Sequence, residues 1–322
     1  MTPINIYDQQ KRNIRRTWTV LFGFVLFLAF LGMGADAFLY GSGIGPGIPV
    51  ATLGALCLGG FSALWALKGG DKAVLESTNA IPIDPSDPKQ KMLDNVVEEM
   101  AIAAGVPKPA VYLIPDPDPN AFATGTGPEK SSIAVTAGTL QTLNREELQA
   151  VVAHELSHVR NYDIRVMTVV AALVGSVLLL SDWGRRGLWW GGGRRRSSND
   201  SGGGSGPLAI LFFVVWIVSL ILAPLIAQLV AMAVSREREY LADASGAELT
   251  RNPLALASAL EKIESATAPT PSIKQGVAHL CIADPRGSAL NAREGAVANL
   301  FATHPPIARR IALLREMAYQ RT

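Results

Sequence analysis

The chain has 322 residues, of which 49% are hydrophobic and 17% are charged, with a formal net charge of +2 at pH 7. Soluble domains carry about 25% charged residues, so this composition is typical of a membrane protein, and the net charge is too small to argue for a nucleic-acid partner. Cys57 and Cys281 are the only cysteines, which excludes a disulfide framework and a cysteine zinc cluster. A metal would therefore be held by histidine and carboxylate side chains.

Two apolar runs near the N-terminus, residues 18–34 and 48–67, predict a hairpin of membrane helices. We interpret the first run as a retained helix, because it is too long for a typical signal peptide. Basic residues flank both returning ends, namely Lys11, Arg12, Arg15, Arg16, Lys68 and Lys72. The positive-inside rule then places the N-terminus and the segment after the hairpin in the cytoplasm. We expect Asp36, at the far end of the first run, to be a solvated end residue, with an interfacial or functional role as the alternative.

From Asp71 the composition becomes that of a soluble domain. Asp87 and Pro88 predict the N-cap and first position of a helix that Gly105 ends. Residues 111–114, 120–125 and 132–136 are each typical of a short strand. An exposed edge of this small sheet can bind an extended peptide by strand addition, although a plain structural hairpin fits the spacing equally well.

Residues 151–160 carry the strongest motif in the chain, His-Glu-Leu-Ser-His. His154 and His158 are four residues apart, so on a helix they lie one turn apart on the same face, with Glu155 beside them. Two neutral imidazoles can hold a zinc ion and the carboxylate can take a proton from a zinc-bound water, which is the pattern of a zinc metalloprotease. Asn144 and Glu147 have the form of a capping box at the start of this helix.

Two further apolar runs follow, residues 166–180 and 208–234. At helical rise the first gives about 22 Å, which is short of the roughly 30 Å hydrocarbon core, whereas the second is long enough to cross. The Gly- and Arg-rich loop 182–206 between them would lie outside, against the positive-inside rule. We nevertheless expect four spans, because the motifs before the third run and after the fourth must meet at one metal. A hairpin that does not cross would also allow this.

The third metal ligand is expected directly after the fourth run. Glu239 and Asp243 are one helical turn apart, so they suit a ligand and an acceptor that orients one histidine through its ring N–H. Glu237 is the competing ligand, but Leu241 leaves it without a carboxylate one turn on. Two histidines and one glutamate leave the fourth tetrahedral position to water, as a catalytic zinc site requires.

Four stretches in this order resemble one family. They are the His-Glu-Leu-Ser-His helix, the Arg-Glu-Tyr-Leu-Ala-Asp segment at 238–243, the Asn-Ala-Phe-Ala-Thr-Gly stretch at 120–125 and the Thr-His-Pro-Pro sequence at 303–306. Together they are similar to the HtpX family of bacterial membrane heat-shock proteases, and more broadly to the gluzincin group that includes the eukaryotic CAAX prenyl protease. The resemblance covers essentially the whole chain.

The resemblance implies a role for each matching residue of the metal site. One zinc ion would be bound by His154, His158 and Glu239, with Glu155 as the general base. Asp243 would support His154 from behind.

The resemblance also implies residues that bind substrate. Asn120 and Ala121 would form the substrate-binding edge strand, and His304 would stabilise the oxyanion beside the scissile carbonyl. Arg310 would face the site, although a solvated or ion-paired arginine fits the sequence nearly as well. Considered without the family, His304 before two prolines is suited simply to helix entry.

We therefore expect a mainly α integral membrane protein with four transmembrane helices and a cytoplasmic gluzincin-like zinc metalloprotease domain that contains a small β-sheet. The expected division is a membrane hairpin at 1–70, a first catalytic part at 71–163, a second membrane pair at 164–234 and a second catalytic part at 235–322. The expected location is the bacterial inner membrane, with the active site and both termini cytoplasmic.

The expected function is that of a zinc endopeptidase that hydrolyses misfolded or damaged membrane proteins. Its partners would be unfolded or misassembled membrane proteins and the lipid bilayer, with no nucleic acid. A prenyl-protein protease is the nearest alternative. An inactive zinc-bound membrane scaffold or chaperone is a further one, but a scaffold has no need for the base Glu155 beside the metal.

Overall fold

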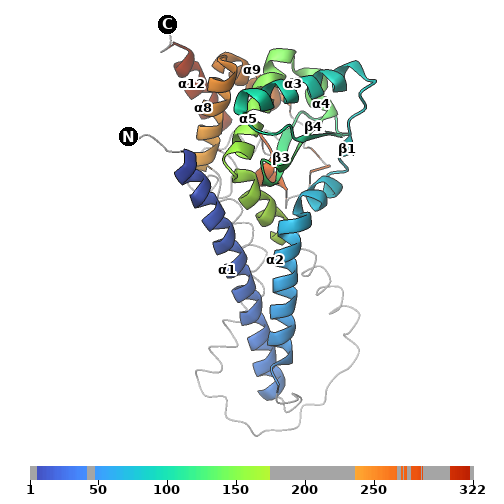
Figure 1. Cartoon of the computed structure of the whole chain (residues 1–322), viewed down its shortest axis with the longest axis vertical. Coiled ribbons are helices and arrows are strands. Elements are labelled where there is room, and N and C mark those ends of the chain that lie inside the picture. The colour runs from blue at the N-terminus through green and yellow to red at the C-terminus, as the bar shows by residue number, and fades with distance from the viewer. Residues whose placement is uncertain are drawn as a thin grey trace.

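In the computed structural model, two long helices project together from one end of a compact domain (Figure 1). The structure describes residues 6–41, 48–174, 236–266, 270, 272–273, 277–283, 285 and 305–319. The two long helices are α1 (Ile6–Gly41) and α2 (Val50–Ser77). Stretches of both, Gln10–Gly34 and Val50–Ser77, are long and apolar enough to cross a membrane, and only 28% and 11% of their most apolar windows are buried within the protein. Large apolar side chains such as Phe22 and Phe61 are exposed on them, which suits a lipid environment.

Asp36 joins the two long helices and is not the solvated end residue that the sequence suggests. Its side chain is buried and accepts hydrogen bonds from the backbone N–H groups of Ala51 and Thr52 at 2.9 and 2.8 Å. The Thr52 hydroxyl donates a third bond at 2.7 Å. The expectation was wrong because the first turn of α2 leaves N–H donors without helical partners, and Asp36 is the carboxylate that meets them.

The third apolar run lies against this hairpin. Residues 163–174 are helical, and Val169, Ala172 and Leu173 pack in one buried cluster with Leu21 of α1 and Ala66 of α2. The rest of that run, the fourth run and the Gly- and Arg-rich loop lie outside the described residues. The packing follows from the apolar character of all three segments.

The domain contains a mixed sheet, which has the order β1-β2-β4-β3 in the described part of the chain. Its strands are β1 (Ile81–Pro82), β2 (Ala110–Ile114), β3 (Ala121–Gly127) and β4 (Lys130–Thr136). β2 runs parallel to β4, and β3 runs antiparallel to β4. The three predicted strands are thus confirmed, while the two-residue strand β1 was not predicted.

Helices lie above the sheet and on one side of it in Figure 1, and α5 (Arg145–Arg160) carries the histidine motif. These helices are α3 (Pro88–Ala104), α4 (Ala137–Thr142), α5 (Arg145–Arg160), α8 (Arg236–Thr250), α9 (Pro253–Ser265), the short η1 (Ala278–Leu280) and α12 (Ile307–Tyr319). The predicted boundaries of α3 are confirmed, because Asp87 caps its first turn and Gly105 ends it in the left-handed conformation at φ 68°. α5 packs against α3, α8, α9 and β3. Val151, Val152 and Leu156 of α5 are fully buried, so the core of the domain holds this helix on several sides.

Candidate metal centre

The capping box predicted for α5 is present. Asn144 Oδ1 accepts a hydrogen bond from the Glu147 N–H, and Glu147 Oε2 accepts one from the Asn144 N–H, both at 2.9 Å. Glu147 also binds Lys262 of α9 at 2.7 Å and Ser258 at 2.7 Å. Burial raises the pKa of Glu147, but these partners outweigh burial and lower it below its ordinary value. The start of α5 is therefore fixed both locally and by α9.

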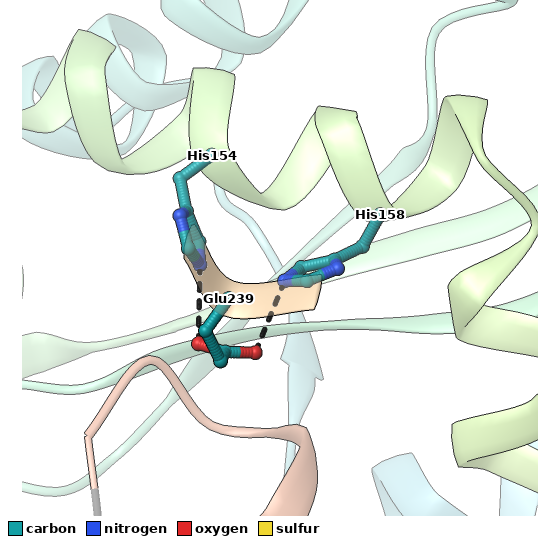
Figure 2. A group of neighbouring side chains, drawn as sticks. All are labelled: His154, His158 and Glu239. Carbon is teal, nitrogen blue, oxygen red and sulfur yellow. Dashed lines mark ion pairs between the residues drawn. The ribbon is translucent and has the colours of Figure 1, made fainter. Parts of the chain in front are cut away.

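His154 and His158 of α5 converge on Glu239 of α8, as Figure 2 shows. Glu239 Oε2 lies 3.7 Å from His154 Nε2, and Glu239 Oε1 lies 3.5 Å from His158 Nε2. One ligand atom from each of the three residues lies within 4.8 Å of the others, and all three side chains are buried. Two imidazole nitrogens and one carboxylate oxygen form the donor set of a catalytic metal site with an open fourth position.

Gly246 allows α8 to approach α5 this closely. A Cβ atom at this position would lie 3.0 Å from the His154 backbone nitrogen and 3.2 Å from its Cα. A larger residue at position 246 would force α8 and α5 apart. Glu239 lies on α8 two turns before Gly246, so it would move away from the histidines as well. Close backbone packing therefore sets the spacing of the three candidate ligands.

Glu155 lies beside the cluster, with 1% of its surface exposed. Within the described structure neither of its carboxylate oxygens has a hydrogen-bond partner. Burial raises the pKa of Glu155 above its ordinary value, against the lowering effect of the two histidines and the nearby Ala123 amide. A buried carboxylate without a partner is costly unless a cation or a proton is close, so its presence fits a metal bound at this cluster.

Asp243 supports His154 from the side away from Glu239. Its Oδ1 lies 3.0 Å from His154 Nδ1, which leaves His154 Nε2 to face the cluster. Asp243 is in turn bound by Arg310, whose Nε and Nη2 groups donate to its two oxygens at 2.8 and 2.7 Å. Burial raises the pKa of Asp243, but the Arg310 guanidinium outweighs burial and lowers it.

Arg310 lies next to the candidate ligand Glu239 and to Asp243. It is fully buried, and its Nη1 donates to the Ile282 carbonyl at 2.8 Å and lies 3.6 Å from Glu239 Oε2. Burial lowers the pKa of Arg310, but Asp243, Glu239 and Glu155 outweigh burial and raise it. The resemblance implies only that Arg310 faces the site, with a solvated or ion-paired arginine as the alternative. The structure shows a buried arginine paired with Asp243.

Ala121 begins β3 and Asn120 directly precedes it. The Asn120 carbonyl accepts a hydrogen bond from the N–H of Thr136, the last residue of β4, at 3.0 Å. Ala121 is buried, and its carbonyl accepts a hydrogen bond from the Ile282 N–H at 2.9 Å. Asn120 Nδ2 donates to the Ala283 carbonyl at 3.1 Å, and Phe122 pairs with Cys281 as an isolated antiparallel bridge. A short segment of the chain, residues 281–283, thus occupies the first part of the outer edge of β3.

Sequence reasoning missed Asp163, whose Oδ2 lies 3.3 Å from His158 Nδ1. No helical spacing indicates this contact, because α5 ends at Arg160 and Tyr162 takes a left-handed backbone conformation at φ 59°. The resulting turn brings Asp163 back to His158. Two other positions considered from the sequence are not covered, because His304 and the Glu237 side chain lie outside the described residues.

Comparison with known proteins gives three findings. The profile of peptidase family M48 matches residues 87–318. A protease HtpX homolog from Caldanaerobacter subterraneus is 44% identical over 98% of this chain and 99% of its own length, and one from Streptococcus pneumoniae is 42% identical over 97% of this chain and all of its own length. Among solved structures, the crystal structure of S. mikatae Ste24p is 17% identical with a TM-score of 0.49, covering 96% of this chain and 67% of that chain.

Proposed function

The chain belongs to peptidase family M48 and is a membrane metalloprotease, and we propose that its metal is zinc and that it cleaves peptide bonds within unfolded or misassembled membrane proteins. The observation that carries this proposal is the convergence of His154, His158 and Glu239 beside the buried Glu155. Imidazole and carboxylate donors in a site with an open position favour catalytic zinc over calcium or magnesium, which prefer oxygen ligands.

Bound zinc supplies a Lewis acid and lowers the pKa of a coordinated water toward about 7. Residues of the chain transfer the proton and orient the ligands. Glu155 is the general base that takes the proton of the attacking water and returns it to the leaving amine. Asp243 Oδ1 orients the imidazole from a distance of 3.0 Å to His154 Nδ1, and Arg310 holds Asp243. His304 is proposed to stabilise the oxyanion, as its family motif implies.

The substrate is proposed to bind as an extended strand along the outer edge of β3, at Asn120 and Ala121. Two features support this position. β3 is the outer strand of the described sheet, and it packs against α5, which carries the candidate ligands. Since the Ala121 carbonyl already accepts the Ile282 N–H, a substrate strand that uses this carbonyl has to displace residues 281–283.

We also propose four membrane spans, with the catalytic domain and both termini in the cytoplasm of a bacterial cell and the chain in the inner membrane. The two described apolar helices and the basic residues at their domain-side ends support this orientation. A site close to the membrane surface suits substrates that are membrane proteins.

The decisive experiment compares wild type, Glu155→Gln and Glu146→Gln in detergent, with metal analysis and cleavage of an unfolded casein. Glu146 is an exposed residue of the same helix, so Glu146→Gln is a control of identical chemistry. We expect all three proteins to bind one zinc ion and Glu155→Gln to lose at least 10²-fold in hydrolysis, since general-base catalysis contributes about 10²–10⁴-fold.

Each other outcome has a clear meaning. An active Glu155→Gln variant would remove the assigned base. Zinc binding without hydrolysis in wild type and both variants would favour a scaffold over an enzyme. Cleavage confined to a farnesylated peptide would identify a prenyl-protein protease instead.

A further inference from the structure

Asp163 lies beside the Nδ1 atom of His158, as Asp243 lies beside the Nδ1 atom of His154. Its Oδ2 is 3.3 Å from His158 Nδ1, and only 1% of its surface is exposed. His158 uses its other ring nitrogen, Nε2, to face Glu239 at 3.5 Å. Both histidines of the cluster therefore have one nitrogen directed at the candidate metal position and one beside a buried carboxylate.

The second oxygen of Asp163 is held by a residue of the first membrane helix. Asn13 Nδ2 donates to Asp163 Oδ1 at 2.7 Å and also to the Asn161 carbonyl at 2.8 Å. Asn13 belongs to α1 and is 150 positions away in sequence, yet only 2% of its surface is exposed. The amide group of one side chain thus ties α1 both to Asp163 and to the turn that ends α5.

Arg238 of α8 completes the surroundings of Asp163. Its Nε lies 3.5 Å from Asp163 Oδ1, and the Arg238 side chain is buried. Asp163 consequently meets donors from three elements, namely His158 of α5, Asn13 of α1 and Arg238 of α8. A carboxylate with this many donors has little freedom to rotate, because turning it breaks at least one contact.

We infer that Asp163 is a positioning residue for His158 and that Asn13 holds Asp163 in place, so that docking of the first membrane helix sets the metal affinity of the site. Asp163 fixes the tautomer of His158 with the proton on Nδ1, which leaves the Nε2 lone pair for the metal. This inference rests on the proposed metal site. It adds a connection between that site and the membrane hairpin.

A purely structural role for Asp163 predicts a different result. Loss of a structural carboxylate would lower the stability of the metal-free protein and leave the affinity for zinc per folded molecule unchanged. A positioning role predicts weaker zinc binding by protein that is still folded. Zinc affinity and metal-free stability therefore have to be measured on the same preparations.

The experiment uses the full-length protein in detergent, with Asp163→Asn, Asn13→Leu and the control Gln10→Leu. The Asp163→Asn variant keeps one oxygen and replaces the other by an NH₂ group. That NH₂ group must face the N–H donor of either His158 or Asn13, so one of the two contacts is lost. Gln10 is a fair control, because it also joins α1 to α5, donating to the Arg160 carbonyl at 2.9 Å, but it does not contact Asp163.

Three quantities are measured for each protein: zinc affinity by chelator competition, the visible spectrum of the Co²⁺-substituted protein, and the thermal unfolding of the metal-free protein. We expect Asp163→Asn to weaken zinc binding about 10–100-fold and to change the Co²⁺ spectrum, as loss of a carboxylate behind a ligating histidine does. Asn13→Leu should weaken zinc binding in the same direction, and Gln10→Leu should bind as wild type does. If Asp163→Asn does not fold, Asn13→Leu carries the test.

Wild-type zinc affinity and an unchanged Co²⁺ spectrum in folded Asp163→Asn and Asn13→Leu would overturn the inference alone. Equal weakening in Gln10→Leu would overturn the role of Asn13 and point to general docking of α1. A wild-type protein that binds no zinc would overturn the proposed function and this inference together.

Discussion

Arg310 and Asp243 form a two-bonded ion pair in the interior of the domain, with donor–acceptor distances of 2.8 and 2.7 Å. Arg310 is fully buried, and Asp243 also lies 3.0 Å from His154 Nδ1. The pair therefore links α12, near the C-terminus, to a candidate metal ligand on α5. A bidentate arginine fixes the orientation of a carboxylate better than a lysine does, because its planar fork meets both oxygens.

Replacing Arg310 by methionine should lower the free energy of unfolding by about 3–5 kcal/mol, because Asp243 would keep a buried charge without its partner. Unfolding in denaturant, followed by circular dichroism in detergent, measures this. Arg310→Lys should be intermediate. The control is Arg315→Met on the same helix, which breaks an exposed pair with Glu261 and should change the free energy by no more than about 1 kcal/mol. Equal effects at positions 310 and 315 would contradict the role given to the buried pair.

Glu239→Gln should reduce bound zinc far below one ion per chain, because an amide is a much weaker ligand than a carboxylate. Glu237→Gln, the same change two residues earlier, should retain zinc. Metal analysis after gel filtration distinguishes the two variants. Loss of zinc in Glu237→Gln with retention in Glu239→Gln would reverse the ligand assignment.

The lowered pKa of Glu147 predicts how stability changes with pH. The ordinary value is 4.5 and the folded value is lower, so the unfolded chain binds the proton more readily. The stabilisation by Glu147 is therefore complete above pH of about 4.5 and is lost as the pH falls through the folded pKa. Glu147→Gln should be less stable than wild type at neutral pH, and the gap should narrow in acid.

This comparison is made on metal-free protein, because acid also releases zinc by protonating histidines. Glu146→Gln, at the neighbouring exposed position, should follow the wild-type profile. A stability gap for Glu147→Gln that stays constant from pH 7 to acid would show that the charge of Glu147 is not the source of its effect.

Asp36 should matter for the pairing of α1 and α2. Asp36→Ala removes the acceptor of two N–H groups at the start of α2, and it should lower the temperature of thermal unfolding in detergent. Asp36→Asn keeps one acceptor oxygen and should lie between Asp36→Ala and wild type. Thr52→Val removes only the hydroxyl bond to Asp36 and should have the smallest effect. An unfolding temperature unaffected by Asp36→Ala would mean that the cap does not stabilise the hairpin.

Features that depend on neighbours in the sequence were predictable. The capping box of Asn144 and Glu147, the Asp87 cap of α3 and the Gly105 end of that helix each act over a few residues, so their residue types are visible in the chain. The same holds for His154, His158 and Glu155. An interval of four residues on a helix places side chains on one face whatever surrounds them.

Features that depend on distant segments were not predictable in the same way. Asp36 was expected in solvent because the sequence of its own helix does not indicate a contact with Ala51 and Thr52. These residues reach Asp36 only because α2 packs antiparallel to α1. Asp163 reaches His158 only through the left-handed turn at Tyr162. No spacing rule links it to Asn13, which is 150 positions away.

Local sequence patterns alone predict an apolar hairpin, a helix with two histidines one turn apart, and a carboxylate segment able to complete a metal site. Each of these follows from the periodicity of a single element and from side-chain chemistry. The contacts between these segments are visible only in the folded structure. The approach of α8 to α5 at Gly246 brings Glu239 to the histidines, and the docking of α1 and α12 supplies Asn13 and Arg310 behind them. The packing of apolar faces determines these contacts, because the polar side chains meet only when their helices share one core.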